Sequence, residues 1–186
     1  MRVLVMALTF AATSVMACGS SQAPLKGGGP TPATLRVEGP GGGAITLVSN
    51  EAATSTILAF PIARVWRILP SAYDSLGLPI AILDPDNHII ANGDTKLRRQ
   101  LGGVPLRNYL DCGGVQIGAS ADSYEIVLTV QTQLKADEAG ATTVMTLVQA
   151  VGKPIAFAQD YSRCGSTGNL EMRLANVIRF KLLQQK

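Results

Sequence analysis

A pair of long β segments joined by a turn constrains the fold more than any other feature of the sequence. From Ser123 to Leu134, apolar and polar residues alternate, with one interruption at Val127. The apolar row consists of Tyr124, Ile126, Leu128, Val130 and Leu134. Residues 135–141 contain Asp, Glu and Gly, which are typical of a turn, and a segment rich in Val and Thr follows over 142–151. This alternation indicates strands with one buried face, so it predicts a long antiparallel hairpin.

The segment after Pro61 has the period of an amphipathic helix. Its apolar residues recur at three- and four-residue steps, which places them on one face. They are Ile62, Val65, Trp66, Leu69, Tyr73 and Leu76. Pro61 suits the first turn of a helix, and Gly77 suits the C-terminal cap. Pro70 lies inside the pattern, where a proline loses a hydrogen bond and bends the helix, so we expect a kink or two short helices.

The C-terminal segment predicts a second helix. Its apolar stripe consists of Leu170, Leu174, Val177, Ile178 and Leu182. Glu171 lies in the first turn, and Arg179 and Lys181 lie near the end. This distribution of charge matches the helix dipole, which favours acids at the N-terminus and bases at the C-terminus.

Shorter apolar runs predict further strands at 44–48 and 54–60, and a hairpin whose strands, 79–83 and 88–92, flank the turn 84–87. The Asp and Asn residues of this turn could instead form a calcium loop, but the later Gly and Glu of the known loop are missing. The order of elements predicts an α+β fold. We expect an antiparallel sheet with a kinked N-terminal helix and a C-terminal helix packed on one face, a two-layer arrangement like the helix grip.

The N-terminus has the pattern of an exported protein. Residues 1–17 comprise one basic residue, an apolar run and small residues, which is typical of a signal peptide. An N-terminal anchor helix is the alternative, although the run is short for a membrane span. The stretch from Val15 to Cys18 resembles the lipobox of bacterial lipoproteins. That resemblance implies cleavage before Cys18 and acylation of Cys18, whereas an ordinary signal peptidase would cut after Ala17 and release a soluble protein.

Residues 18–43 separate this leader from the predicted domain at 44–186. Gly, Pro and Ser dominate the segment, and its sparse apolar residues cannot form a core. We therefore expect a flexible linker between a lipid anchor and an extracytoplasmic domain, with a brief strand possible at 34–38. Several acyl chains hold a protein durably on a bilayer. In the lipoproteins that this lipobox resembles, an Asp directly after the Cys favours retention in the inner membrane. Gly19 stands at that position here, so the resemblance implies the outer membrane, with the domain facing the periplasm.

Two cysteines remain after Cys18. Cys112 and Cys164 would be exported into an oxidising compartment, where an even pair predicts a disulfide. The bridge would join the loop before the long hairpin to the loop before the last helix. A redox-active pair is the alternative, but the cysteines of catalytic pairs are usually two residues apart.

Two segments contain candidate contact residues. Ser166 and Thr167 lie in a Gly-rich loop before the last helix and predict an N-cap, or alternatively an anion site at the helix start. Arg98 and Arg99 belong to the basic segment 94–108. We expect that segment to be a solvated face, and contact with anionic headgroups or peptidoglycan is the alternative.

Composition limits the classes of function. The net charge of +3 is too small for the basic stripe of a nucleic-acid-binding protein. His88 is the single histidine, which excludes a multi-histidine metal site within one chain. No nucleophile-elbow motif accompanies Ser166 and His88, so a hydrolase is the least favoured class. We expect no metal, no cofactor and no enzymatic activity.

Two signatures resemble a group of uncharacterised bacterial lipoproteins. One runs from Tyr109 to Gly113 and continues at 121–124, and the other runs from Cys164 to Glu171. The resemblance implies a shared fold and a shared cysteine pair over most of residues 55–182, without an activity. The order of elements is also similar to the helix-grip lipoprotein of the outer-membrane β-barrel assembly machinery. We therefore expect a membrane-anchored lipoprotein that binds another envelope component, or alternatively a small apolar or lipid ligand, and the oligomeric state stays open.

Overall fold

The predicted long hairpin forms the centre of the main sheet. The computed structural model describes residues 34–38, 44–48, 53–115, 118–156 and 158–185. Strands β12 (Tyr124–Ala136) and β13 (Thr142–Pro154) pair antiparallel over their full length of 13 residues each. The turn between them is closed by hydrogen bonds from Asp137 N to Ala141 O and from Gly140 N to Asp137 O. The first strand extends two residues beyond its predicted end.

Short strands flank both halves of this hairpin. Two strands pair with opposite ends of β12, namely β5 (Ile89–Asn92) and β6 (Thr95–Arg98). Two others pair with opposite ends of β13, namely β3 (Thr54–Leu58) and β14 (Ser162–Ser166). Strand β4 (Ile80–Asp84) lies outside β5, and β9 (Leu110–Asp111) lies outside β14. All of these pairs are antiparallel and together form an eight-stranded sheet.

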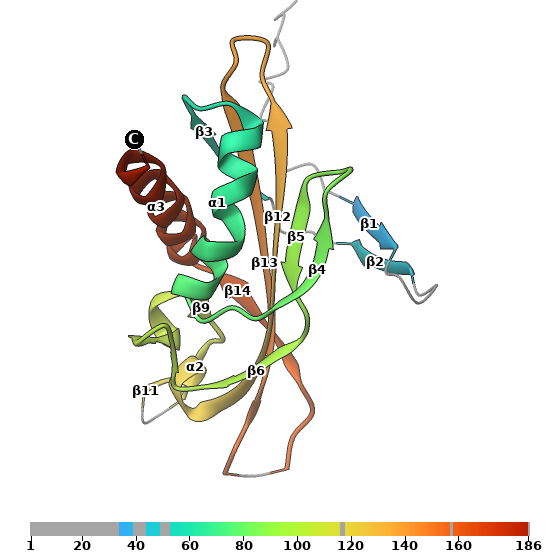
Figure 1. Cartoon of the computed structure of the whole chain (residues 1–186). Coiled ribbons are helices and arrows are strands. Elements are labelled where there is room, and N and C mark those ends of the chain that lie inside the picture. The colour runs from blue at the N-terminus through green and yellow to red at the C-terminus, as the bar shows by residue number, and fades with distance from the viewer. Residues whose placement is uncertain (1–33, 39–43, 49–52, 116–117, 157, 186) are drawn as a thin grey trace, which may run out of the picture.

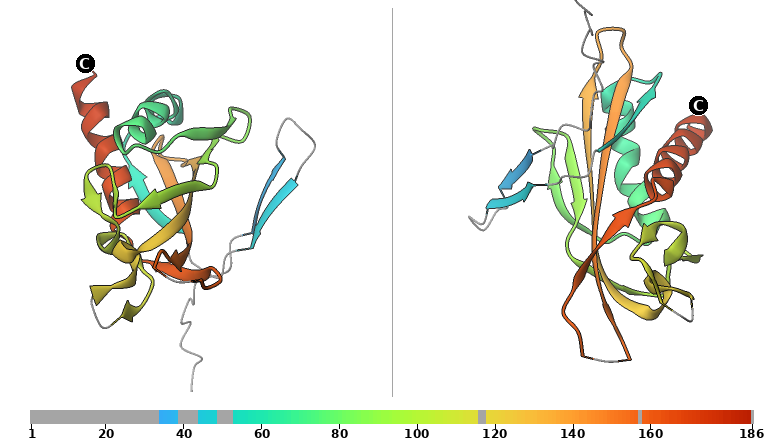
Figure 2. Two further views of the ribbon diagram at one scale, coloured as in Figure 1. Left: turned by 90° about the horizontal axis from the view of Figure 1, so that it is seen from below. Right: turned by 180° about the vertical axis from the view of Figure 1, so that it is seen from behind.

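Two helices cover one face of this sheet, as Figures 1 and 2 show. Helix α1 (Ile62–Ser75) buries Val65, Leu69 and Tyr73 of its predicted stripe. Helix α3 (Asn169–Gln184) buries four of its five predicted stripe residues and half-buries Val177. The α+β prediction, with helices on one face of an antiparallel sheet, is confirmed.

Helix α1 runs through Pro70 without a break. The backbone is helical from Ile62 to Ser75, so the alternative of two short helices is wrong. Pro70 lacks the N–H that would otherwise bond to the carbonyl of Trp66, four residues earlier. Packing of the buried side chains on both sides of Pro70 compensates for that missing bond, because burial stabilises a helix more than its intrinsic propensity does.

The segment between β6 and β12 folds into small elements at one end of the sheet (Figure 1). They are β7 (Gln100–Leu101), β8 (Val104–Pro105), the 3₁₀ turn η1 (Leu106–Asn108), β9, β10 (Gly114–Val115), β11 (Gly118–Ala119) and helix α2 (Ser120–Ser123). Leu101, Leu106 and Tyr109 of this segment are buried in the core. The predicted basic face of 94–108 is therefore only partly solvated, since its apolar residues point inwards.

A hydroxyl network connects α1 to the middle of the sheet. The Tyr73 hydroxyl is buried, lies 2.9 Å from Thr132 Oγ1 and donates to Ile90 O at 3.2 Å. Burial raises the pKa of the Tyr73 phenol far above its usual value, since the charged form would be poorly solvated there. Thr132 itself lies 3.4 Å from Thr146 Oγ1 on β13. One polar cluster thus fixes how α1 sits on the two central strands.

The predicted hairpin at 79–92 is present as β4 and β5. Asp84 closes its turn, because its Oδ1 accepts hydrogen bonds from Asp86 N at 3.0 Å and Asn87 N at 3.1 Å. The carboxylate also accepts from the Asn87 side chain at 2.8 Å, and these bonds lower the pKa of Asp84. The carboxylate is thus engaged in the turn itself, which supports the turn over the calcium loop.

The leader, Cys18 and most of the linker lie outside the described residues. Within the linker, the possible strand at 34–38 is present as β1 (Thr34–Glu38). It pairs antiparallel with the predicted strand β2 (Ala44–Val48) in a separate two-stranded sheet. Among the described residues, no helix has both the length and the apolar character needed to cross a membrane.

Candidate functional site

Cys112 and Cys164 are bonded to each other, as predicted. Cys112 directly follows β9, and Cys164 lies within β14 rather than in the predicted loop, with the two Cα atoms 4.2 Å apart. Gly152 on β13 faces the bridge, and a Cβ at this position would lie 3.3 Å from Cys164 Sγ and 2.6 Å from Ile126 Cδ1. The side of the bridge that faces the sheet therefore packs tightly against the core.

Ser166 and Thr167 are engaged within the loop that leads into α3. Ser166 Oγ accepts from Gly168 N at 3.1 Å and donates to Glu171 Oε1 at 2.7 Å. Thr167 Oγ1 donates to Asn108 O at 2.8 Å. The N-cap residue of α3 is Gly168, with a left-handed backbone, so neither hydroxyl is the N-cap itself.

Glu171 occupies the start of α3. Its side chain is 5% exposed, and its carboxylate accepts the Ser166 hydrogen bond in the first turn of the helix. A carboxylate at this position already satisfies the attraction of a helix N-terminus for negative charge. The geometry therefore supports a structural role for Ser166 and Thr167 more than the alternative of an anion site.

Glu125 is the centre of a polar cluster on the sheet face that the helices leave open. Its carboxylate accepts from Arg98 at 2.8 Å and from the Tyr161 hydroxyl at 2.8 Å, and lies 3.8 Å from Lys153 Nζ. Cross-strand pairing creates the cluster, because Glu125 on β12 stands opposite both Arg98 on β6 and Lys153 on β13. The hydrogen bond from Arg98, together with that from Tyr161, lowers the pKa of Glu125 to about 2.

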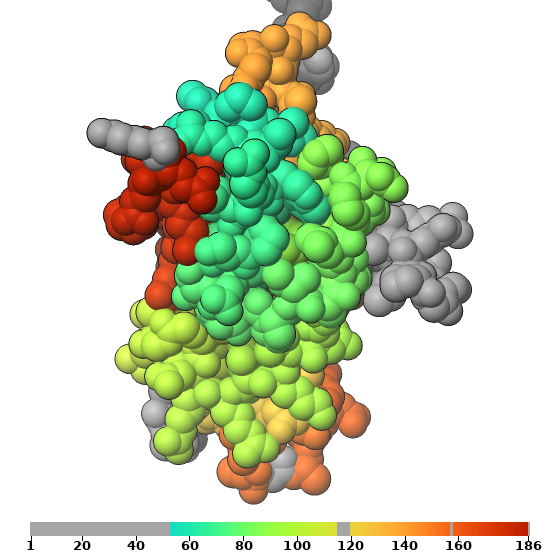
Figure 3. Space-filling view, in the orientation of Figure 1, coloured from blue at the N-terminus to red at the C-terminus, as the bar shows by residue number. Residues whose placement is uncertain are grey.

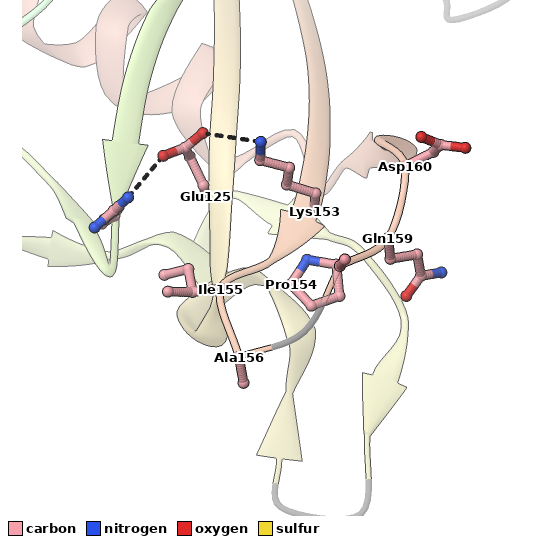
Figure 4. A pocket seen from close by; sticks show the side chains of 9 residues that line it. Glu125, Lys153, Pro154, Ile155, Ala156, Gln159 and Asp160 are labelled. Atoms are coloured by element: carbon pink, nitrogen blue, oxygen red, sulfur yellow. Dashed lines mark hydrogen bonds and ion pairs between the residues drawn. The ribbon is translucent and has the colours of Figure 1, made fainter.

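An open cavity of about 760 Å³ lies beside this cluster (Figure 4). Arg98, Glu125 and Lys153 line it together with the loop after β13, of which Ile155 and Asp160 are part. The lining thus includes two cationic and two anionic side chains. Because these charges balance, the cavity does not select strongly for an anion or a cation.

The cluster is suited to holding strands together rather than to acid–base chemistry. A catalytic acid or base works best when its pKa lies near the working pH. Glu125 is ionised throughout the neutral range, and three cationic or hydroxyl groups occupy its oxygens. Arg99, the other arginine of the predicted pair, does not line the cavity. It has a positive φ of 66°, and its carbonyl accepts from Leu106 N at 2.8 Å.

The residues named for a hydrolase are not brought together. His88 lies near the end of β12, where its carbonyl oxygen accepts a hydrogen bond from Leu134 N. The imidazole ring of His88 contacts Trp66 edge-on, with 5.4 Å between the ring centroids. Ser166 lies beside Leu110, at the end of the sheet where β14 meets β9. Among the described residues, no three His, Cys, Asp or Glu side chains are grouped so as to bind a metal.

The sequence alone does not indicate the partners of Glu125. Alternation puts Glu125 among the polar residues of the first long strand, but Lys153 lies beyond the predicted end of the second strand, and Tyr161 lies in the following loop. The two strands of a regular hairpin have equal lengths, and the predicted first strand is longer than the predicted second strand. This difference could have indicated that the second strand extends beyond residue 151 to Lys153. The position of Tyr161 depends on the path of the loop after the second strand, which no sequence pattern predicts.

Comparisons with known proteins add no assignment to this geometry. A scan against protein-family models found no match, and a search of the curated proteins found none either.

Proposed function

We propose that this protein is a bacterial lipoprotein, acylated on Cys18 and held on the outer membrane, whose domain binds another component of the cell envelope without catalysis. The observation that carries the proposal is the division of the three cysteines. The fold pairs Cys112 with Cys164, so the disulfide does not include Cys18, which follows the predicted leader sequence. A disulfide in a domain of this size is in keeping with an oxidising, exported environment.

The state of the polar side chains supports binding rather than catalysis. Asp84, Glu125, Ser166 and Thr167 all bond to groups of the protein itself. Apolar side chains, among them Leu69, Ile126, Leu174 and Ile178, are buried in the core between the sheet and the helices. Apolar side chains that pack on one another favour contacts through the surface over an internal lipid or apolar ligand.

Labelling with radioactive palmitate in the producing bacterium tests the anchor. We expect the wild-type protein to take up label, Cys18→Ser to lose it, and Cys112→Ser to keep it. Cys112→Ser is the matched control, because it also removes one of the three thiols. Label on the Cys18→Ser variant, or a mature protein that retains residues 1–17, would refute the proposal.

A further inference from the structure

Helix α3 has a second apolar stripe that the core does not use. Met172, Phe180 and Leu183 are 55%, 61% and 64% exposed. With 100° of rotation per residue, these three residues and Asn176 lie on one side of the helix. The opposite side buries Leu174 and Ile178 against the sheet. In Figure 3, α3 lies at the edge of the molecule beside α1.

An open groove of about 430 Å³ follows this stripe. It is lined by Asn169, Met172, Arg173, Asn176, Val177 and Phe180. The lining consists of two overlapping sets of four residues, each with the spacing i, i+3, i+4, i+7. Four residues at this spacing form the hole that receives one side chain of a facing helix. This surface of α3 therefore has the shape on which another helix packs.

The charge beside the groove has one sign. Helix α3 contains Arg173, Arg179 and Lys181, and Glu171 is its single acid, which is buried at the first turn. Arg173 is held at the rim by hydrogen bonds to the Tyr109 hydroxyl and to Gly102 O. Arg179 donates to Asn176 Oδ1 at 3.0 Å. A partner with carboxylates beside its apolar residues complements this surface.

Helix α3 of a second copy of the chain does not suit this groove. In an antiparallel pair of α3 helices centred on Asn176, Arg173 of one copy would face Arg179 of the other. In a parallel pair, each arginine would lie beside its own counterpart. Like charges across an interface are unfavourable, so both arrangements oppose self-association. A lipid bilayer could bury the apolar stripe, but lipid chains do not pack into holes of this spacing. A bilayer would also leave the polar Asn176, which belongs to both holes, without a specific partner.

We propose that the groove on α3 docks an amphipathic helix of another envelope protein, with apolar side chains at i and i+4 and with Asp or Glu beside them. This inference rests on the proposed function and names the kind of partner that the lipoprotein binds. The apolar residues of the partner would enter the two holes, and its carboxylates would face Arg173 and Arg179.

Site-specific photo-crosslinking of the full chain in living bacteria tests the inference. A photoreactive amino acid replaces Asn176 in one strain and Ile57 in the other. Ile57 is the matched control, because it is an exposed apolar residue, at 65%, on β3 rather than on α3. We expect position 176, and not position 57, to crosslink to a helical segment of one envelope protein that has acids beside an apolar stripe.

Variants then test the chemistry of that contact. We expect Phe180→Ser to reduce the crosslink yield by about tenfold or more, as the loss of a central aromatic contact does, while Ile57→Ser leaves it unchanged. The double change Arg173→Glu and Arg179→Glu should cause a similar loss, and replacing the facing acids of the partner with lysine should restore the crosslink. Unchanged thermal midpoints would show that the variants remain folded.

Four outcomes would overturn the inference: crosslinks from position 176 to a second copy, to lipid, to a segment without acids, or to nothing. The proposed function is judged separately, by palmitate on Cys18. If the label is present and an envelope protein crosslinks only from other surfaces, the lipoprotein proposal stands and the α3 inference fails.

Discussion

At the scale of single residues, buried hydrogen-bonding groups determine how the layers fit together. Tyr73 is the clearest case, since one hydroxyl from α1 meets Thr132 and Ile90 in the middle of the sheet. A buried hydroxyl with good partners stabilises a fold modestly, but its removal leaves those partners without a bond. The helical period places Tyr73 on the buried face, whereas its partners come from two strands that are remote in the sequence.

We expect Tyr73→Phe to lower the free energy of unfolding by about 1–2 kcal/mol, because Thr132 loses a buried partner. Urea unfolding at neutral pH measures this change.

The pKa of Tyr73 is raised from 10.0, so the unfolded chain loses the phenol proton at a lower pH than the folded one. Stability should therefore fall above pH 10.0 in the wild type, and less steeply in Tyr73→Phe. Equal alkaline profiles would contradict the prediction.

Glu125 gives a prediction at acidic pH. Its pKa is about 2 in the folded protein and 4.5 in the unfolded chain. The folded state binds the proton less readily, so the stabilisation is complete above pH 4.5 and is lost as the pH falls towards 2. We expect Glu125→Gln to flatten the decline of thermal midpoint over this window, by a small amount because the cluster is open to water. Glu138→Gln, in the exposed turn, is the control and should leave the slope as it is.

At the scale of elements, one side chain bridges a gap in the sheet. Strand β5 pairs with residues 131–133 of β12, and β6 pairs with 125–128. Between them, Asn92 Nδ2 donates to Leu128 O at 2.9 Å, and its Oδ1 accepts from Val130 N. The amide thus takes the place of a backbone partner where the chain passes from β5 to β6. No sequence pattern indicated this role, because it depends on the register of three strands.

We expect Asn92→Ala to lower the free energy of unfolding by about 2–4 kcal/mol, since two buried backbone groups lose their partners. Asn87→Ala is a suitable control, because Asn87 is an exposed turn residue and the change removes its side-chain hydrogen bond to Asp84. Chemical denaturation of the two variants gives the comparison. If both cost the same, the amide of Asn92 does not support β12.

Pro70 gives a second prediction at this scale. Replacing it with alanine supplies the N–H that the carbonyl of Trp66 lacks, so Pro70→Ala should raise the free energy of unfolding by about 1–3 kcal/mol. Pro61→Ala should change little, because Pro61 is the N-cap residue of α1 and lies where no intrahelical N–H bond is made. Thermal unfolding followed by circular dichroism distinguishes them. Destabilisation by Pro70→Ala would mean that packing around α1 depends on the proline.

At the scale of the whole molecule, the disulfide ties the segment before the long hairpin to the strand before α3. Cys112 and Cys164 are separated by 52 residues, and that interval contains both central strands of the sheet. Closing such a loop restricts the unfolded chain, which is the main stabilising effect of a disulfide in the loop-entropy model. The disulfide predicted from the number of cysteines is confirmed. The sequence did not predict that Cys164 lies within a strand, β14.

We expect the double variant Cys112→Ser and Cys164→Ser to lose about 4 kcal/mol of unfolding free energy, the value that the loop-entropy model assigns to a loop of this length. Urea titration of the oxidised wild type against the variant measures the loss. Cys18→Ser is the control and should unfold like the wild type, because that residue takes no part in the bridge. A change of less than about 1 kcal/mol would show that the bridge is not a major source of stability.

The sequence alone determined the longest elements, because periods of two and of 3.6 residues follow directly from strand and helix geometry. The hairpin from β12 to β13 and the two amphipathic helices were predictable on this basis, and the pairing of Cys112 with Cys164 was predictable from the number of cysteines. The tertiary structure decided which side chains meet across elements. Gln131 shows the difference: alternation predicts an exposed side chain, yet it is 2% exposed, beside the buried Ala91 and Leu147. The partners of Glu125 and the exposed stripe of α3 likewise depend on register and packing, which a local period does not encode.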